Sequence, residues 1–202
     1  MKHILKQKNH IGRPKTFDKN EVLKLAMLHF WEHGYDNTSL DDLLMAMGIK
    51  KSSFYSTFKS KEEIFSLTLD VYRQETFSFL KNLKNEVGAK ETLLTLANSI
   101  IKELKDTGKV KGCLMMNSSK ECYGKYPDLS HQIALDFNTF SDFFATIIEE
   151  AKNKKEILNS LSAQVITGRF LSISNGLVIM IQAGASKEVI DDILLSINEL
   201  LE

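Results

Sequence analysis

The sequence predicts an all-α protein in two parts, an N-terminal unit of three short helices and a larger helical body. Apolar residues recur at three- and four-residue spacing along most of the chain, which is the period of an amphipathic helix. Only two prolines, Pro14 and Pro127, interrupt the chain, and no run of alternating β-branched residues indicates a strand. At 202 residues, the chain has room for a small module joined to one sizeable core.

Charge is distributed unevenly along the chain, although the formal net charge is zero. Residues 1–61 hold 11 Lys/Arg and 6 Asp/Glu, whereas residues 62–202 hold 15 and 20. A basic module on an acidic body is typical of a nucleic-acid-binding protein whose body has a different role. Chance clustering is the alternative, since the excess is modest.

The two cysteines form no disulfide framework, so a reducing cytoplasm fits better than secretion. Residues 1–10 are basic, but no apolar segment follows them as it would in a signal peptide. The longest uncharged run, residues 170–186, contains several polar side chains and falls short of a membrane span. We therefore expect a soluble cytoplasmic protein with no membrane segment.

Residues 1–15 hold five basic and no acidic residues and show no helical period. They are either an arm that touches the DNA backbone or minor groove, or a solvated tail. The first helix is expected to begin after Asp18, an N-cap with Glu21 three residues on, and to end at Gly34. His29 and His33 have a metal-ligand spacing but no partner ligand nearby, so we expect no metal site.

A helix pair follows. Thr38 is expected to be the N-cap of the second helix, with Asp41 completing a capping box, and Gly48 ends that helix. A third helix starts near Lys51 and turns Phe54 inward, together with Phe58 one turn later. Its outer face is basic, hydroxyl-rich and aromatic, which suits contacts to phosphates and base edges in a major groove. This arrangement is a helix-turn-helix; a plain helical hairpin with a solvated face is the alternative.

Residues 22–65 resemble the N-terminal domain of the tetracycline-repressor (TetR) family of bacterial regulators. The resemblance rests on Ala26, Phe30, Gly34-Tyr35, Thr38, Gly48-Ile49, Tyr55, Phe58 and Ser60-Lys61-Glu62. It implies a DNA-binding domain over residues 15–61 and a ligand-binding and dimerisation domain over residues 62–202. It also implies that a homodimer binds a near-palindromic operator in double-stranded DNA. The expected DNA contacts are Thr38, Lys50, Lys51, Ser52, Ser53, Tyr55, Ser56, Thr57 and Lys61, with Lys61 contacting phosphate as in the family.

The sequence departs from the family pattern at the third helix. Lys50 stands where the family usually has a serine that caps this helix, and Ser52 stands at a usual glycine. Ser56 and Thr57 occupy positions where histidines are common. Loss of the cap should cost the helix about 1 kcal/mol unless Ser52 takes over that role.

The body begins with one long helix, from Lys61 after the N-cap Ser60 to about Val87. A helix over residues 90–105 follows, and residues 112–121 resemble a short helix that lies beside the ligand cavity in one branch of the family. A further helix starts at Pro127 and ends in the charged residues 152–156. Its apolar seam comprises Leu129, Ile133, Phe137, Phe140, Phe144, Ile147 and Ala151.

Polar residues inside these apolar helices are the candidates for a small-molecule site. Together with the phenylalanines around them, they would contact a small apolar or amphipathic ligand. The expected ligand contacts are Asn117, Glu121, Phe137, Asn138, Phe140 and Phe144. Plain hydrophobic core is an equally good interpretation of the phenylalanines. Cys113 is expected to be a buried packing thiol, and Cys122 lies near Lys120 and Lys125, which could lower its pKa; whether either thiol is a sensor stays open.

The last two helices predict a partner surface. Residues 161–183 are apolar nearly all round, and Gly168, Ser172 and Gly176 stand four apart on one face that another helix can approach closely. In the family, the last two helices form a four-helix bundle between two subunits. The expected dimer contacts are Gly168, Ser172, Gly176, Ile190, Leu194 and Ile197. The alternative is that these helices are buried within one chain.

No glycine-rich phosphate loop, Cys-x-x-Cys pair or nucleophile elbow is present, so we expect neither catalytic residues nor a cofactor. The favoured function is a homodimeric repressor that leaves its operator when a small ligand binds the body. The alternatives are a ligand-blind architectural or division-control DNA-binding protein, and a repressor that senses electrophiles or oxidants through a thiol. An enzyme or an interaction scaffold is the least favoured.

Overall fold

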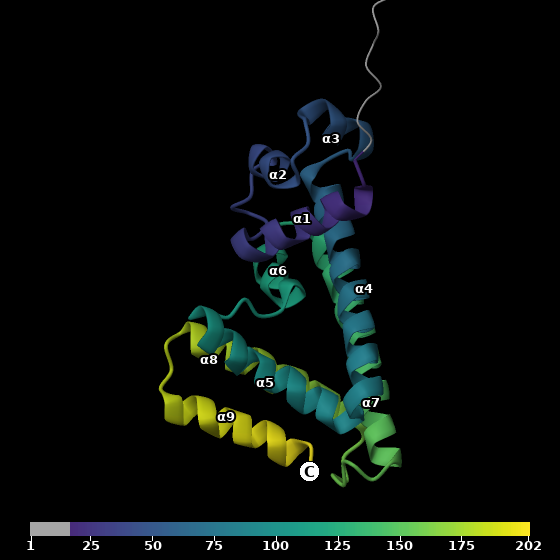
Figure 1. Cartoon of the computed structure of the whole chain (residues 1–202), viewed down its shortest axis with the longest axis vertical. Helices are drawn as coiled ribbons and strands as arrows, with labels where there is room; N and C mark the ends of the chain where they lie inside the picture. Colours follow the sequence, from purple (N-terminus) through teal and green to yellow (C-terminus); the bar gives the residue numbers. More distant parts are fainter. Residues whose placement is uncertain (1–16) are drawn as a thin grey trace, which may run out of the picture.

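The computed structural model describes residues 17–202, and this part of the chain consists of α-helices joined by short connections, without a strand. Figure 1 shows α1–α3 gathered at one end of the molecule, α4 running away from them beside α7, and α5, α8 and α9 layered at the other end. We call α1–α3 the head and α4–α9 the body. The helices are α1 (Lys19–His33), α2 (Leu40–Met47), α3 (Lys51–Thr57), α4 (Lys61–Val87), α5 (Ala89–Thr107), α6 (Leu114–Cys122), α7 (Pro127–Asn153), α8 (Ala163–Gln182) and α9 (Lys187–Leu200).

The predicted all-α fold is confirmed, and each helix lies close to its predicted bounds. The arm predicted for residues 1–15 lies outside the described residues. The boundary between the two domains, placed at residues 61 and 62, stays a prediction. It falls in the first turn of α4, a single helix that belongs to the core of both parts.

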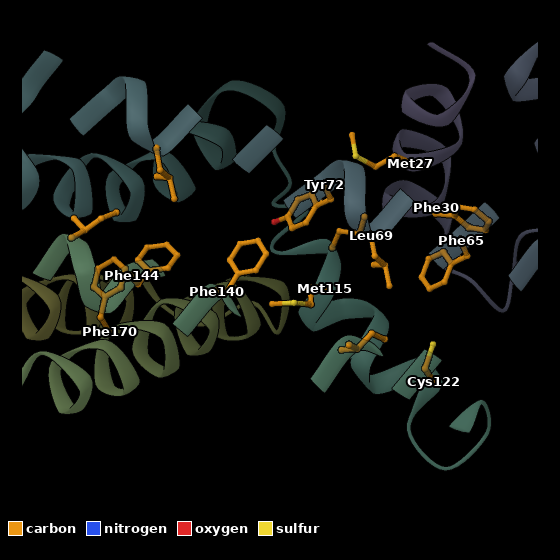
Figure 2. Close-up of a cluster of buried hydrophobic side chains, with 14 of the residues drawn as sticks. Met27, Phe30, Phe65, Leu69, Tyr72, Met115, Cys122, Phe140, Phe144 and Phe170 are labelled. Carbon is orange, nitrogen blue, oxygen red and sulfur yellow. The ribbon is translucent and has the colours of Figure 1, made fainter. Parts of the chain in front are cut away.

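The head is held together by aromatic side chains. Phe54 of α3 and Phe58, the residue that ends this helix, are buried, as their spacing predicts. Phe30 of α1 meets Phe65 of α4 edge to face, with 4.8 Å between ring centroids (Figure 2). The head therefore packs on the first turns of α4, so that its orientation follows that helix.

The N-cap of α2 is Ser39, so the prediction of Thr38 is wrong by one residue. The Ser39 hydroxyl accepts from the Asp42 amide (3.1 Å), and the Asp42 carboxylate accepts from the Ser39 amide (2.9 Å). Thr38 is instead buried, and its hydroxyl donates to the Gly34 carbonyl (2.6 Å). Thr38 with Asp41 and Ser39 with Asp42 both have the spacing of a capping box, so the sequence alone does not decide between them.

α4 is 27 residues long and, at 1.5 Å per residue, spans about 40 Å. Its N-cap is Ser60, whose hydroxyl accepts from the Glu63 amide (3.1 Å), as predicted. The Glu63 carboxylate accepts from the Lys59 amide and not from the Ser60 amide, so Ser60 and Glu63 do not form a reciprocal capping box. α4 packs against α1 at one end and against α5 and α7 along the rest of its length, so one helix links head and body.

α3 begins without a side-chain cap. Its N-cap residue, Lys50, forms no capping hydrogen bond, and Ser52 does not replace it. The first amides of α3 are therefore left to solvent, which costs the helix stability.

We expect the substitution Lys50→Ser to raise the free energy of unfolding, because a serine hydroxyl there can accept from the Ser53 amide. The gain should be about 1 kcal/mol, a rise in Tm of roughly 2–4 °C for a chain of this length. Thermal denaturation followed by circular dichroism measures it. Ser52→Ala is the control, because Ser52 is exposed and forms no capping hydrogen bond, and it should leave Tm nearly unchanged. An unchanged Tm for Lys50→Ser would show that the start of α3 does not limit stability.

Candidate DNA-binding surface and ligand cavity

The exposed face of α3 carries most of the predicted DNA contacts. Lys50, Lys51, Ser52, Tyr55 and Ser56 are all exposed on this helix or at its N-cap. The Tyr55 side chain is 55% exposed. This face joins two cations, a phenol and two hydroxyls on a helix short enough to enter a major groove.

Ser53 and Thr57 lie at the edge of this face and are half-buried. The hydroxyls of Ser56 and Thr57 donate to the Ser53 carbonyl, at 2.8 and 3.1 Å. Thr38 is only 1% exposed, so its side chain is not free to contact DNA. The corresponding prediction for Thr38 does not fit this structure, because its hydroxyl closes the turn after α1.

Lys61 is turned into the head. Its ammonium donates to the carbonyls of Tyr35 (2.8 Å) and Thr38 (2.9 Å) and lies 4.1 Å from the centroid of the Tyr35 ring. Burial lowers the pKa of Lys61 from its usual range. Two of the three N–H groups are thus used within the head, which leaves one for the predicted phosphate contact.

The body contains a cavity of about 270 Å³. Tyr72 of α4, Phe140 and Phe144 of α7 and Phe170 of α8 line it, and Figure 2 shows these four side chains following one another. Its wall combines aromatic and aliphatic side chains with a few polar groups, as in most small-molecule sites. The lining residues are Trp31, Tyr72, Thr76, Leu96, Ser99, Ile100, Glu103, Gly112, Cys113, Met115, Met116, Phe137, Phe140, Phe144, Phe170, Leu171, Ser174, Asn175 and Val178.

Three of the six predicted ligand contacts line this cavity, namely Phe137, Phe140 and Phe144. Asn138 is exposed, because one residue further along α7 turns a side chain by about 100° away from the cavity. Asn138, Asn117 and Glu121 do not line this cavity; Asn117 and Glu121 line a separate pocket between α1 and α6, so their contact with a ligand stays a prediction. Asn117 donates its side-chain amide to the Lys111 carbonyl (2.7 Å), outside the cavity.

Trp31 is a lining residue that sequence reasoning missed. It belongs to α1 of the head, yet its indole N–H donates to the carbonyl of Gly112 in the body (3.0 Å). Its ring meets Tyr72 edge to face, with 5.2 Å between centroids. The cavity is consequently walled in part by the head itself.

Glu121 joins the body to the head. Its carboxylate accepts from the backbone amides of Tyr35 (2.7 Å) and Asp36 (3.0 Å), in the turn after α1. At the preceding residue, Gly34, φ is +82°, and a Cβ built there would clash with the Glu121 carboxylate. Only glycine suits both the conformation and the close approach.

The connection after α6 adds two further bonds to the same turn. Lys125 donates to the Asp36 carboxylate (2.6 Å), and the Tyr126 hydroxyl donates to its other oxygen (2.8 Å). These hydrogen bonds lower the pKa of Asp36. Together with the bonds from Glu121 and Trp31, we call them the α6 contact. It ties the end of α1 to the segment that also places Met115 and Met116 in the cavity wall.

The two cysteines differ in their surroundings. Cys122 is fully buried, and burial raises the pKa of its thiol to about 11, which disfavours the thiolate that a sensor would need. Lys125 is bound to Asp36 and does little to offset this effect. Cys113 is the thiol that lines the cavity, where it accepts a hydrogen bond from the Tyr72 hydroxyl (3.4 Å).

α8 carries an exposed stripe of small and apolar residues. Gly168 and Ser172 are exposed, and at Gly168 and Gly176 a Cβ would meet no atom within 4 Å. Val165, Ile179 and Met180 extend the stripe and are each over 40% exposed. By length and composition alone α8 resembles a membrane span. Its most apolar stretch of 18 residues has a mean hydropathy of 1.3, and 28% of that stretch is buried.

The three residues of α9 expected at the dimer interface, Ile190, Leu194 and Ile197, face the core of their own chain. Ile197 is 1% exposed, so it belongs to the core of its own chain, and its assignment to a dimer surface is wrong. Ile190 and Leu194 are partly buried against the same core. Val189 and Leu195 are the large apolar residues of α9 that remain exposed. The i, i+3, i+4 pattern marks an apolar face but does not say which neighbour covers it.

We expect Glu121→Ala to loosen the turn after α1 without unfolding the protein. Hydrogen exchange of the Tyr35 and Asp36 amides should rise at least about tenfold, since a hydrogen bond to a charged group contributes about 1.5–3 kcal/mol. Exchange resolved by mass spectrometry measures this. Glu86→Ala, at an exposed residue of α4, is the matched control. Equal protection of the turn in both variants would show that Glu121 does not hold it.

Comparisons with known proteins agree with this architecture. A family model described as "Bacterial regulatory proteins, tetR family" matches residues 22–67, and one described as "Tetracyclin repressor-like, C-terminal domain" matches residues 89–196. Over 148 residues, the chain is 29% identical to the HTH-type transcriptional regulator YezE of Bacillus subtilis, covering 73% of this chain and 76% of YezE.

Over 113 residues, the chain is 37% identical to the HTH-type transcriptional repressor ComR of Escherichia coli. That match covers 53% of this chain and only 52% of ComR. A structure of the TetR-family regulator CifR, a cysteine mutant complexed with 26-base-pair operator DNA, aligns with a TM-score of 0.74. The alignment covers 94% of this chain and 98% of that one at 20% identity, which supports the fold alone.

The helix-turn-helix head and the helical body are thus matched by separate family models, the second of which covers more than half of the chain. The chain is a transcriptional regulator of the tetR family.

Proposed function

We propose that this regulator is a homodimeric repressor that binds a near-palindromic operator through α3 and leaves it when a small apolar or amphipathic ligand enters the cavity. The observation that carries the proposal is that the cavity and the head share a wall. Trp31 belongs to the head and lines the cavity. An occupant of the body would therefore touch the DNA-binding part directly.

The exposed face of α3 supports the DNA-binding half of the proposal. Phosphate contacts from Lys50 and Tyr55 would position the helix, and the side chains of Lys51, Ser52 and Ser53 would meet base edges. CifR, which has the same fold, is described in complex with operator DNA, and ComR is described as a repressor. Such a regulator works in the cytoplasm, where the operator is.

The exposed stripe of α8 supports dimerisation. Small residues at four-residue spacing allow two helices to approach closely, and the flanking apolar side chains would otherwise face water. Two heads on a two-fold axis meet half-sites about 34–36 Å apart, one helical turn of DNA. Dimerisation also supplies affinity that one short helix lacks, since linked sites bind with a high effective concentration.

The proposed release is a shift in population between two arrangements of the head. A ligand can bias them only by binding one arrangement more tightly than the other. Here the ligand would contact Trp31 of the head and Met115 and Met116 of α6, so its fit depends on how α1 sits against α6. The ligand-blind alternative leaves this cavity, and its wall shared with the head, without a role.

Substitutions in α3 test the DNA-binding proposal. Lys51→Ala should change which bases are preferred in a selection from random double-stranded DNA, because the side chain lies on the proposed groove face. Tyr55→Phe, which removes one phosphate-bonding hydroxyl, should weaken all sequences about equally. Lys105→Ala, an exposed change on α5, is the control for loss of a positive charge. If no sequence is enriched by the unaltered protein, or Lys51→Ala leaves the enriched sequence and its affinity unchanged, α3 does not contact DNA as proposed.

Substitution in the α8 stripe tests the dimer. A leucine at Gly176 meets no atom of its own chain near Cβ, so any loss must come from a partner that it holds away. Overpacking of this kind typically costs about 1–3 kcal/mol. We expect Gly176→Leu to give monomers or aggregates in sedimentation and to lose operator binding. Asn98→Leu, which adds an exposed leucine on α5, should remain dimeric. A dimeric, operator-binding Gly176→Leu protein would place the interface elsewhere.

A further inference from the structure

We propose that the cavity selects a small organic cation, such as an aromatic or aliphatic ammonium compound. This inference rests on the proposed function, in that it names the class of ligand for the same cavity. It is carried by the one charged side chain in the cavity wall, by the rings that surround it, and by a buried hydroxyl without a partner.

Glu103 of α5 is the only side chain among the described lining residues with a full charge at neutral pH. One of its oxygens accepts from the Lys111 amide (3.3 Å). No lysine, arginine or histidine in residues 17–202 forms an ion pair with it. Glu103 is half-buried, so its unpaired carboxylate is free to form a charge-assisted hydrogen bond with a cation that enters the cavity. An anionic ligand would meet this charge as repulsion.

The remaining wall is suited to a weakly hydrated cation. Trp31, Tyr72 and Phe140 contribute π-faces, with three more phenylalanines around them. Such faces attract ammonium groups within about 6 Å of the ring centroid. Lys111 already places its ammonium 6.0 Å from the centroid of Trp31. The rim of the cavity thus attracts a cation from the chain itself, and a ligand would compete with this exposed side chain.

The Ser174 hydroxyl adds a polar group on the opposite wall. It is buried, lines the cavity and has no hydrogen-bond partner within the described chain. A buried hydroxyl of this kind is costly unless a ligand or water completes it. The volume of about 270 Å³ restricts the occupant to a small molecule. A monocation with an apolar body and one further polar atom fits all three features.

The test uses a pair of probes that differ in charge but hardly in shape, phenyltrimethylammonium and tert-butylbenzene. Trp31 is the single tryptophan of the chain and lines the cavity, so its fluorescence reports binding without a label. The full-length protein is titrated as the unaltered chain and as Glu103→Gln. Glutamine keeps an oxygen for the Lys111 amide and removes only the charge. Thermal melting establishes that both proteins are folded.

We expect Glu103→Gln to lower the affinity for phenyltrimethylammonium at least tenfold and to change the affinity for tert-butylbenzene less than twofold. Lys111→Gln, which removes the competing cation, should tighten phenyltrimethylammonium binding and leave tert-butylbenzene unaffected. If Glu103→Gln leaves the cation affinity unchanged, or weakens both probes equally, the cationic class is wrong while the cavity stands as a ligand site. If neither probe alters Trp31 fluorescence at millimolar concentration, the cationic class and the ligand half of the proposed function both fail. The DNA-binding half of the proposed function is tested separately by operator binding and does not depend on either outcome.

Discussion

The carboxylate of Glu121 lies against the backbone of the turn after α1, and much of the arrangement of head and body depends on this contact. It accepts from the amide of the buried Tyr35 and from that of the exposed Asp36. The approach requires a residue without a side chain at Gly34. A few atoms thus fix where the head meets the body, and they do so at the element that also walls the cavity.

α4 makes the complementary connection, and it is held firmly to the body. Arg73 of α4 pairs with Asp70 on its own helix and with the buried Asp136 of α7. Burial, more than Arg73 can offset, raises the pKa of Asp136. Lys84 pairs with Glu150 further along the same two helices. Because breaking a buried pair is costly, α4 and α7 are expected to move together if they move at all.

The fold could be predicted well from sequence because helix ends carry local signals. Asp18, Gly34, Gly48 and Ser60 each mark an end that the structure reproduces. The error at Thr38 and Ser39 arose where two neighbours fit one signal. Local rules therefore located the elements and the exposed face of α3, which needs only helical periodicity and a turn.

The cavity was harder to predict because its wall is assembled from distant segments. Phe140 and Phe144 belong to a periodic seam and were found by that period. Trp31 lies 81 residues before Gly112, whose carbonyl orients it, and no local pattern announces that bond. Polar residues in apolar helices were a misleading guide, since Asn138 faces solvent and Glu121 faces the head. The same limit explains Ile197, whose neighbour only the tertiary structure identifies.

The position of α6 follows from its surroundings more than from its own sequence. It has nine residues and no side-chain cap at Cys113, its N-cap residue. Helices this short are marginal in isolation, so packing determines whether and where it forms. Its neighbours are the head on one side and the cavity on the other, through Glu121 and Met115 respectively. A change of packing in the cavity therefore acts on an element with little stability of its own, and the head is bonded to that element.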